Sequence, residues 1–175
     1  MKRFLLLAPL VLVLSVSASA APRRAPKGWK KYNGPWFSVY YPATWKAAAG
    51  KSPASTGGGK LDTASFSSPD GRAQFAIYAP MWNGQPTDLN IDTKREKRVS
   101  RMVVASTDSI KSKIETRWQT FRALNGGYTR SIVDVENKTL NTRRVLGFRY
   151  KDAATYNRYL PQFQKFKSSL IQYTD

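Results

Sequence analysis

The chain has 175 residues and a formal net charge of +18, because 29 lysines and arginines outnumber 11 aspartates and glutamates. It contains no cysteine and no histidine, which excludes disulfides, Ser-His-Asp and Cys-His nucleophiles, and zinc sites built from thiolates or imidazoles. An ordinary enzyme is therefore not expected. The excess of positive charge favours an acidic protein, an anionic polymer or an anionic lipid surface as partner, or serves solubility alone.

Residues 1–20 are typical of a secretory signal peptide. Two basic residues precede the apolar stretch Phe4–Val16, and the pattern Ala18-Ser19-Ala20 follows, so we expect cleavage after Ala20. The apolar stretch is interrupted by Pro9 and is shorter than the roughly 20 residues that span a bilayer. We therefore predict an exported protein, periplasmic, lumenal or extracellular, without a transmembrane span in its mature chain.

Residues 21–35 are basic and contain several prolines, which predicts an extended arm in front of a single domain over residues 36–175. Trp36–Tyr41 is rich in aromatic and β-branched residues and predicts a strand. Pro42 lacks an amide hydrogen and ends that strand. Trp45 is then placed to pack over the strand end.

Two stretches resemble ligand-binding loops without completing the motif. Gly50-Lys51-Ser52 resembles the end of a phosphate-binding loop, but Trp45 stands where the motif requires its first glycine. Asp88, Asn90 and Asp92 resemble the start of a calcium loop, but the positions for glycine and the final glutamate hold other residues. We therefore expect no cofactor and no conventional metal centre, and leave a weak calcium site open.

Alternating apolar residues predict several further strands. Residues 63–80 indicate a hairpin around the turn Pro69-Asp70-Gly71. Residues 94–104 are interpreted as a strand with a cationic outer face, and residues 110–124 alternate cleanly between apolar and charged side chains. Asn125-Gly126 is a strong hairpin turn, and strands are expected on both sides of a second turn near Asn137.

The last part of the sequence changes period. Apolar residues from Tyr156 to Leu170 recur at three- and four-residue steps, which predicts an amphipathic helix with Asp152 as its N-cap. Pro161 lies inside this pattern and predicts a kink or a second helix start. One apolar helix face on one apolar sheet face gives an α+β fold, an antiparallel meander sheet covered on one face by a C-terminal helix.

With these elements assigned, the sequence resembles the PsbP family of extrinsic photosystem proteins and their non-photosynthetic exported relatives. Its three matching stretches are Phe37–Trp45, Ser65–Pro80 and an ending that contains Tyr156, Tyr159, Phe163 and Phe166–Leu170. The resemblance implies an antiparallel sheet with helical cover in an exported, non-enzymatic protein. This chain has neither the histidines implicated in metal retention by some members nor a lipid-anchoring cysteine, so no functional residue is carried over.

Three functions follow as hypotheses. The first is an exported, non-enzymatic binding or accessory protein that acts through protein contact. The second is binding of an anionic polymer or membrane surface by the sheet face opposite the helix, and a photosystem-associated role is a minority alternative. The alternation predicts that the cationic face holds Lys111, Lys113, Arg117, Arg130, Arg143 and Arg149.

Two further residue groups are weighed against ordinary structural roles. Trp82, beside Asn83-Gly84, is the aromatic residue most suited to ligand contact outside the predicted core. Asp134 and Glu136 share one strand face and are close enough to act as an acid pair, although solvated carboxylates beside arginines are the ordinary explanation.

Overall fold

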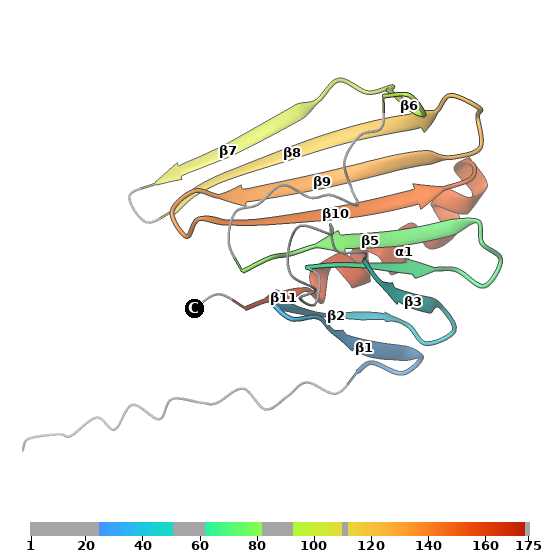
Figure 1. The fold of residues 1–175 in the computed structure, drawn as a ribbon, viewed down its shortest axis with the longest axis horizontal. Coiled ribbons are helices and arrows are strands. Elements are labelled where there is room, and N and C mark those ends of the chain that lie inside the picture. The colour runs from blue at the N-terminus through green and yellow to red at the C-terminus, as the bar shows by residue number, and fades with distance from the viewer. Residues whose placement is uncertain (1–24, 51–61, 82–92, 110–111, 174–175) are drawn as a thin grey trace, which may run out of the picture.

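The computed structural model describes residues 25–50, 62–81, 93–109 and 112–173 (Figure 1). The predicted signal peptide with its cleavage point, Trp82, the calcium-like loop and Lys111 lie outside the described residues. Most of the glycine-rich stretch after Gly50 also lies outside them.

One strand of the smaller sheet, β1 (Trp29–Asn33), lies within residues 21–35, where an extended arm was expected. Strand β1 pairs antiparallel with β2 (Phe37–Pro42), and β11 (Ile171–Gln172) pairs with the other edge of β2. Trp29 and Tyr32 pack against the main core. The apolar contacts of these two rings outweigh the basic character that favoured an arm.

The larger sheet is antiparallel throughout and joins two meanders. The first contains β3 (Lys46–Ala49), β4 (Thr63–Ser67) and β5 (Ala73–Tyr78), and the second contains β8 (Ser112–Ala123), β9 (Thr129–Asn137) and β10 (Thr142–Tyr150). They meet where β5 pairs with β10, with Phe75 opposite Phe148. The predicted α+β architecture with an antiparallel sheet is therefore confirmed.

The far edge of this sheet contains two short strands where one was expected over residues 94–104. Strands β6 (Glu96–Arg98) and β7 (Val103–Ser109) both pair with β8. The amides of Val99 and Ser100 both donate to the carbonyl of Thr120. This convergence on a single carbonyl interrupts the ladder, so the edge strand begins again only at Val103.

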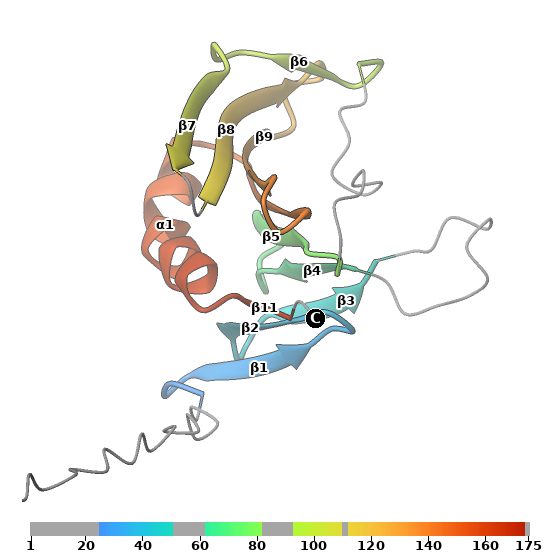
Figure 2. The same ribbon diagram turned by 90° about the vertical axis from the view of Figure 1, so that its left-hand side faces the viewer.

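The helix of the described part of the chain, α1 (Ala153–Ser168), covers one face of the sheet (Figure 2). Asp152 is its N-cap, as predicted, and accepts a hydrogen bond of 2.8 Å from the amide of Thr155. Pro161 does not start a second helix, because α1 continues through it. Pro161 lies on the exposed side, where the carbonyl left unpaired in the preceding turn can reach water. Buried Tyr159 and Phe163 hold both halves of α1 on the sheet.

Aromatic rings fill the space between α1 and the sheet. Phe75 is fully buried, and its ring centroid lies 5.2 Å from those of Phe163 and Phe166. The buried Trp45 ring has its centroid 4.4 Å from that of Phe75 on β5 and 5.2 Å from that of Tyr159 on α1, so it packs between sheet and helix. Aromatic pairs at these separations stabilise a core beyond the area that they bury.

Helix α1 covers only part of its sheet face. It packs against β2, β5 and β10, whereas β7, β8 and β9 extend beyond it and curve toward the side on which α1 lies (Figure 2). We call these three strands the wing. A second apolar cluster, of Tyr78, Phe121, Ile132 and Val145, lies on the face opposite α1. The wing therefore has an uncovered surface on the side of the helix.

The cap of α1 predicts a pH dependence of stability. Hydrogen bonds from the amide and hydroxyl of Thr155, and then from Arg72, lower the pKa of Asp152 from 3.8 to about 2. Because the folded-state pKa lies below the unfolded value, this contribution is complete above about pH 4 and is lost as pH falls toward 2.

We expect Asp152→Asn, which keeps a good N-cap but removes the titration, to lower the midpoint of thermal unfolding near neutral pH. The difference between the two proteins should shrink as pH falls from about 4 to about 2. A difference that stays constant over this range would contradict the assignment. Circular dichroism melting curves provide the measurement.

Candidate functional site

A cleft of about 340 Å³ lies where the wing extends beyond α1. Its apolar lining comes from both layers, with Val103, Trp118 and Val133 on the strands and Tyr156, Leu160 and Phe163 on the helix. The volume falls within the roughly 300–1,000 Å³ typical of small-ligand pockets.

Strand register explains why this cleft is apolar. Val103 lies opposite Trp118, Trp118 opposite Val133, and Val133 opposite Leu146, so one apolar row crosses four strands. Leu146 is buried in the main core, whereas Trp118 is 38% exposed and Val103 is 57% exposed. The row thus leaves the core beneath α1 and becomes exposed on the wing.

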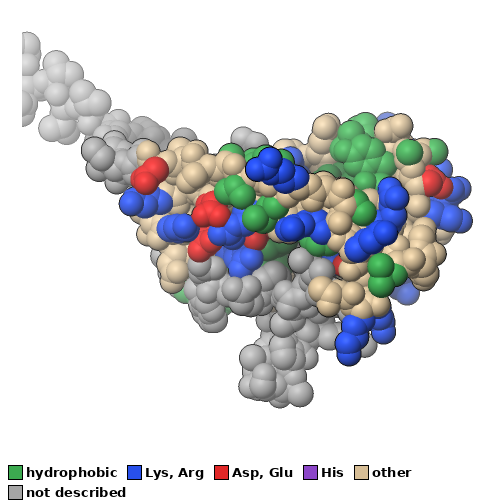
Figure 3. Space-filling model, turned by 90° about the horizontal axis from the view of Figure 1, so that it is seen from above, with side chains coloured by type: hydrophobic (Ala, Val, Ile, Leu, Met, Phe, Trp, Pro, Cys, Tyr) green, Lys and Arg blue, Asp and Glu red, His purple; other side chains and the backbone are tan. Residues whose placement is uncertain are grey.

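Positive charge lines the rim of the cleft. Arg101, just before β7, and Lys167, in the last turn of α1, both line it. No carboxylate occurs among the described residues that line the cleft. Seen from above, on the side of β6 and β7, lysines and arginines lie among hydrophobic side chains, while most carboxylates gather toward one end and one lies at the other (Figure 3). The cleft combines an apolar floor with a cationic rim.

The structure brings five of the six predicted cationic residues to the sheet face opposite α1. The pairing register places Arg143 in one row with Glu136, and Arg149 in one row with Arg130, while Lys113 and Arg117 follow the same alternation on β8. Lys111 lies outside the described residues. The sequence also indicated that Asp134 and Glu136 lie beside arginines, but it did not show which arginines pair with them or that Glu96 and Glu115 join these contacts.

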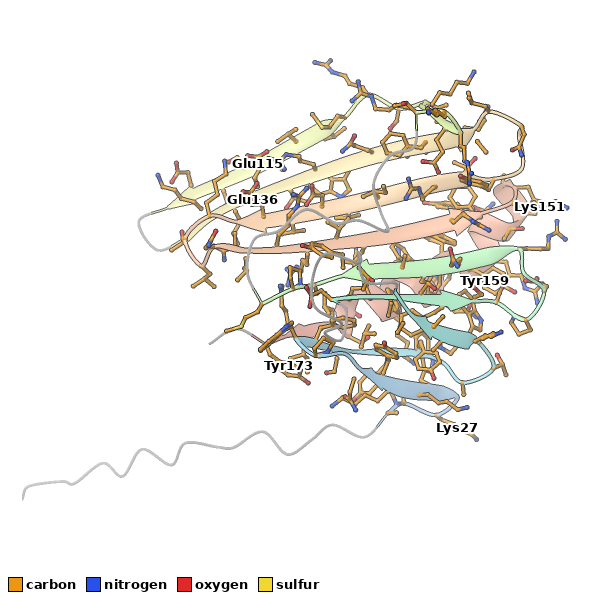
Figure 4. The ribbon with its side chains drawn as sticks, in the orientation of Figure 1. Lys27, Glu115, Glu136, Lys151, Tyr159 and Tyr173 are labelled. Carbon is orange, nitrogen blue, oxygen red and sulfur yellow. The ribbon has the colours of Figure 1, made fainter. Side chains whose placement is uncertain are left out.

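Carboxylates pair with the arginines at the centre of this face. Arg117 lies 2.5 Å from Glu115, 3.2 Å from Glu136 and 3.6 Å from Asp134. Arg143 donates two hydrogen bonds, of 2.9 and 2.7 Å, to Asp134, and this donation raises the pKa of Arg143. Glu115 and Glu136 lie side by side on β8 and β9 (Figure 4). Asp134 and Glu136, the possible acid pair of the sequence analysis, are therefore both in ion pairs with arginines.

A second group of ionic contacts involves the remaining predicted residues. Arg130 forms an ion pair of 2.5 Å with buried Glu96, and the Tyr128 hydroxyl donates to the same carboxylate at 2.8 Å. The Arg149 guanidinium lies over the Tyr128 ring, 4.8 Å from its centroid. Burial, followed by the hydrogen bond to Glu96, raises the pKa of Tyr128. This group ties β6 to β9 and β10.

The described residues limit the kinds of site that the protein offers. They contain no group of three or more carboxylate, histidine or cysteine side chains that could hold a metal ion. Within the same residues, no helix has both the length and the apolar character needed to cross a membrane.

A solved structure is similar to this arrangement of sheets and helix. The solution structure of cyanobacterial PsbP (CyanoP) from Synechocystis sp. PCC 6803 matches 89% of this chain and 99% of its own, with a TM-score of 0.50 and 12% sequence identity. The chain has a PsbP-like fold. At this identity the likeness shows the fold alone. No protein-family model matches the sequence, and no curated protein is similar to it.

The sequence stretches that carried the PsbP resemblance surround the main core. They correspond to β2 with Trp45, to the β4–β5 hairpin and to α1. Their aromatic residues meet around Phe75. Trp118 and Val103 lie outside these stretches. The similarity to PsbP therefore concerns the fold and does not include the strand side of the cleft.

The ionic contacts of the face opposite α1 give a prediction about polyanions. Replacing Asp134 with Asn and Glu136 with Gln removes two carboxylates with little change in size. We expect heparin to bind this double variant more tightly, and the affinity to fall more steeply with salt. Arg143 loses its ion pair with Asp134, and Arg117 loses two of its three carboxylate partners and keeps Glu115.

Heparin-column retention at several salt concentrations provides the measurement, with thermal unfolding as a check on folding. The matched control is Asp108→Asn, which removes a carboxylate that lies 3.7 Å from Lys113 in an exposed pair. Equal retention of the double variant and the unaltered protein would show that the carboxylates do not neutralise this face.

Proposed function

We propose that the protein is an exported, non-catalytic accessory protein that binds another protein through the cleft between α1 and the wing. The observation that carries this proposal is the exposure of Trp118 within an apolar cleft that both layers of the fold build. Export is supported by the signal-peptide pattern of residues 1–20. An accessory role is in keeping with the PsbP-like fold.

The chemistry of the cleft favours binding over catalysis. Its polar lining includes the hydroxyls of Ser100, Thr120 and Ser131. The Ser100 hydroxyl accepts the amide of Thr120, and the Thr120 and Ser131 hydroxyls lie 3.4 Å apart. These hydroxyls therefore stabilise neighbouring strands, and no carboxylate of the described lining stands beside them as a base.

Trp118 has the properties of an anchor for protein contact. Tryptophan is enriched among the residues that dominate binding energy, because it buries a large area and loses little side-chain entropy. Here Trp118 lines the same cleft as Leu160 and Phe163 of α1. A partner side chain that entered the cleft would complete the burial of this cluster.

Binding of an anionic polymer by the opposite face is the weaker alternative. The net charge of +18 favours it. The ion pairs of Arg117, Arg130 and Arg143 with carboxylates disfavour it, because much of the positive charge on that face is already balanced. The cleft, by contrast, has cations and no carboxylate among its described lining residues.

Affinity capture with the tagged chain lacking residues 1–20 tests the proposal. We expect Trp118→Ala and Leu160→Ala each to reduce recovery of the partner about tenfold, as loss of an anchor contact costs 1–2 kcal/mol or more. Leu124→Ala is the matched control, because Leu124 is 55% exposed and is absent from the described lining of the cleft.

Two results would contradict the proposal. One is a partner recovered equally well by the unaltered protein and by the two cleft variants. The other is the absence of any near-stoichiometric partner from an extract of the exported compartment. Thermal unfolding of each variant distinguishes a lost contact from a lost fold.

A further inference from the structure

Strand β7 forms an exposed edge of the larger sheet. Among the described residues it pairs only with β8, and every residue from Val103 to Asp108 is exposed (Figure 1). Val103 and Val104 are 57% and 47% exposed, and Met102, just before the strand, is 38% exposed. An exposed edge with apolar side chains is a template for pairing with another chain.

The hydrogen-bond pattern shows which backbone groups of β7 point outward. Lys113 donates its amide to the Thr139 hydroxyl and accepts the Lys138 amide at its carbonyl, so both of its backbone groups point toward β9. Asp108 lies opposite Lys113 and is therefore in a non-hydrogen-bonded pair with β8. By the alternation of an antiparallel ladder, the amides and carbonyls of Val104, Ser106 and Asp108 face the outer edge.

The other sheet edges are protected in ways that β7 is not. Strand β1 carries Lys30 and Lys31 on its exposed positions, and β3 is only four residues long and begins with Lys46. Strand β7 has seven residues and no lysine, arginine or proline, and its one charged residue, Asp108, lies near its end and 3.7 Å from Lys113. Lysines and short length are common devices against edge pairing, so their absence at β7 marks this edge as the one suited to receive a strand.

The β7 edge adjoins the candidate cleft. The apolar row Leu146–Val133–Trp118 ends at Val103, which is also a lining residue. A strand added to β7 would extend this row by one residue, whose side chain would lie at the mouth of the cleft. Arg101 and Lys167 at the rim would then face that added strand.

We propose that β7 receives an extended, acidic segment of the partner as an added strand, with alternate apolar side chains of that segment directed into the cleft. The inference rests on the proposed function, since it names how the partner occupies the same site. The cationic rim and the net charge of +18 select an acidic segment. They also disfavour a second copy of this chain, which would bring the same excess of positive charge.

Amide NMR of the isotope-labelled chain lacking residues 1–20 tests the inference. The probe is a peptide of about eight residues in which valine and glutamate alternate, long enough to cover one strand. We expect the peptide to slow hydrogen exchange at the amides of Val104, Ser106 and Asp108. The amides of Ala105 and Thr107 already face β8 and should change little. A peptide of alternating valine and lysine is the charge control and should not bind.

A pair of substitutions at one position isolates the backbone contribution. Ser106→Pro removes an outward amide that β8 does not use, so the fold should survive, whereas Ser106→Ala keeps that amide. We expect Ser106→Pro to weaken peptide binding about tenfold and Ser106→Ala to leave it unchanged. Binding without protection of the three outward amides would overturn the inference. So would equal binding of the two charge forms, or concentration-dependent dimerisation that protects the same amides without peptide.

The capture experiment separates failure of this inference from failure of the proposed function. If Trp118→Ala abolishes capture of the partner and Ser106→Pro does not, the cleft binds the partner and the added strand is wrong. If neither substitution affects capture, both proposals are wrong. If both substitutions reduce capture and Ser106→Ala does not, the partner uses the cleft and the edge together.

Discussion

Four aromatic rings meet between the helix and the sheet, Phe75 and Phe148 from the strands and Phe163 and Phe166 from α1. Four of their pairs have centroid separations of 5.0 to 5.2 Å. Without disulfides, the chain depends on this layer to hold α1 in place. The three-stranded sheet depends on it as well, because Trp29 and Tyr32 pack against the same cluster. The position of α1, which this layer fixes, determines which part of the sheet is covered and where the cleft lies.

The width of α1 determines how many strands of the larger sheet it can cover. A helix about 10 Å across covers roughly two strands at a spacing of about 4.8 Å, and the larger sheet contains eight strands. The uncovered wing continues the apolar row of the core outward. The cleft and the exposed edge of β7 therefore both arise because the sheet is wider than the helix that covers it. The opposite face differs, because its central arginines pair with carboxylates from neighbouring strands.

Much of the fold could be predicted from the sequence because it depends on local patterns. The apolar spacing predicted α1, and the predicted Asp152 cap was also found. The ion pairs of Arg117 and Arg143 could not be, because they depend on the register of β8, β9 and β10. The cleft was missed for a related reason: alternation over residues 110–124 predicts an apolar strand face, but sequence spacing does not show how far the helix reaches across that face.

Denaturant unfolding of two variants tests most directly whether the aromatic layer, and not the wing, carries the fold. Phe75 is fully buried and Trp118 is 38% exposed. We predict that Phe75→Ala lowers the free energy of unfolding by about 3–5 kcal/mol. Trp118→Ala should lower it by about 1 kcal/mol or less. If Trp118→Ala destabilises the protein as much as Phe75→Ala does, then Trp118 is a core residue and is not available to a partner.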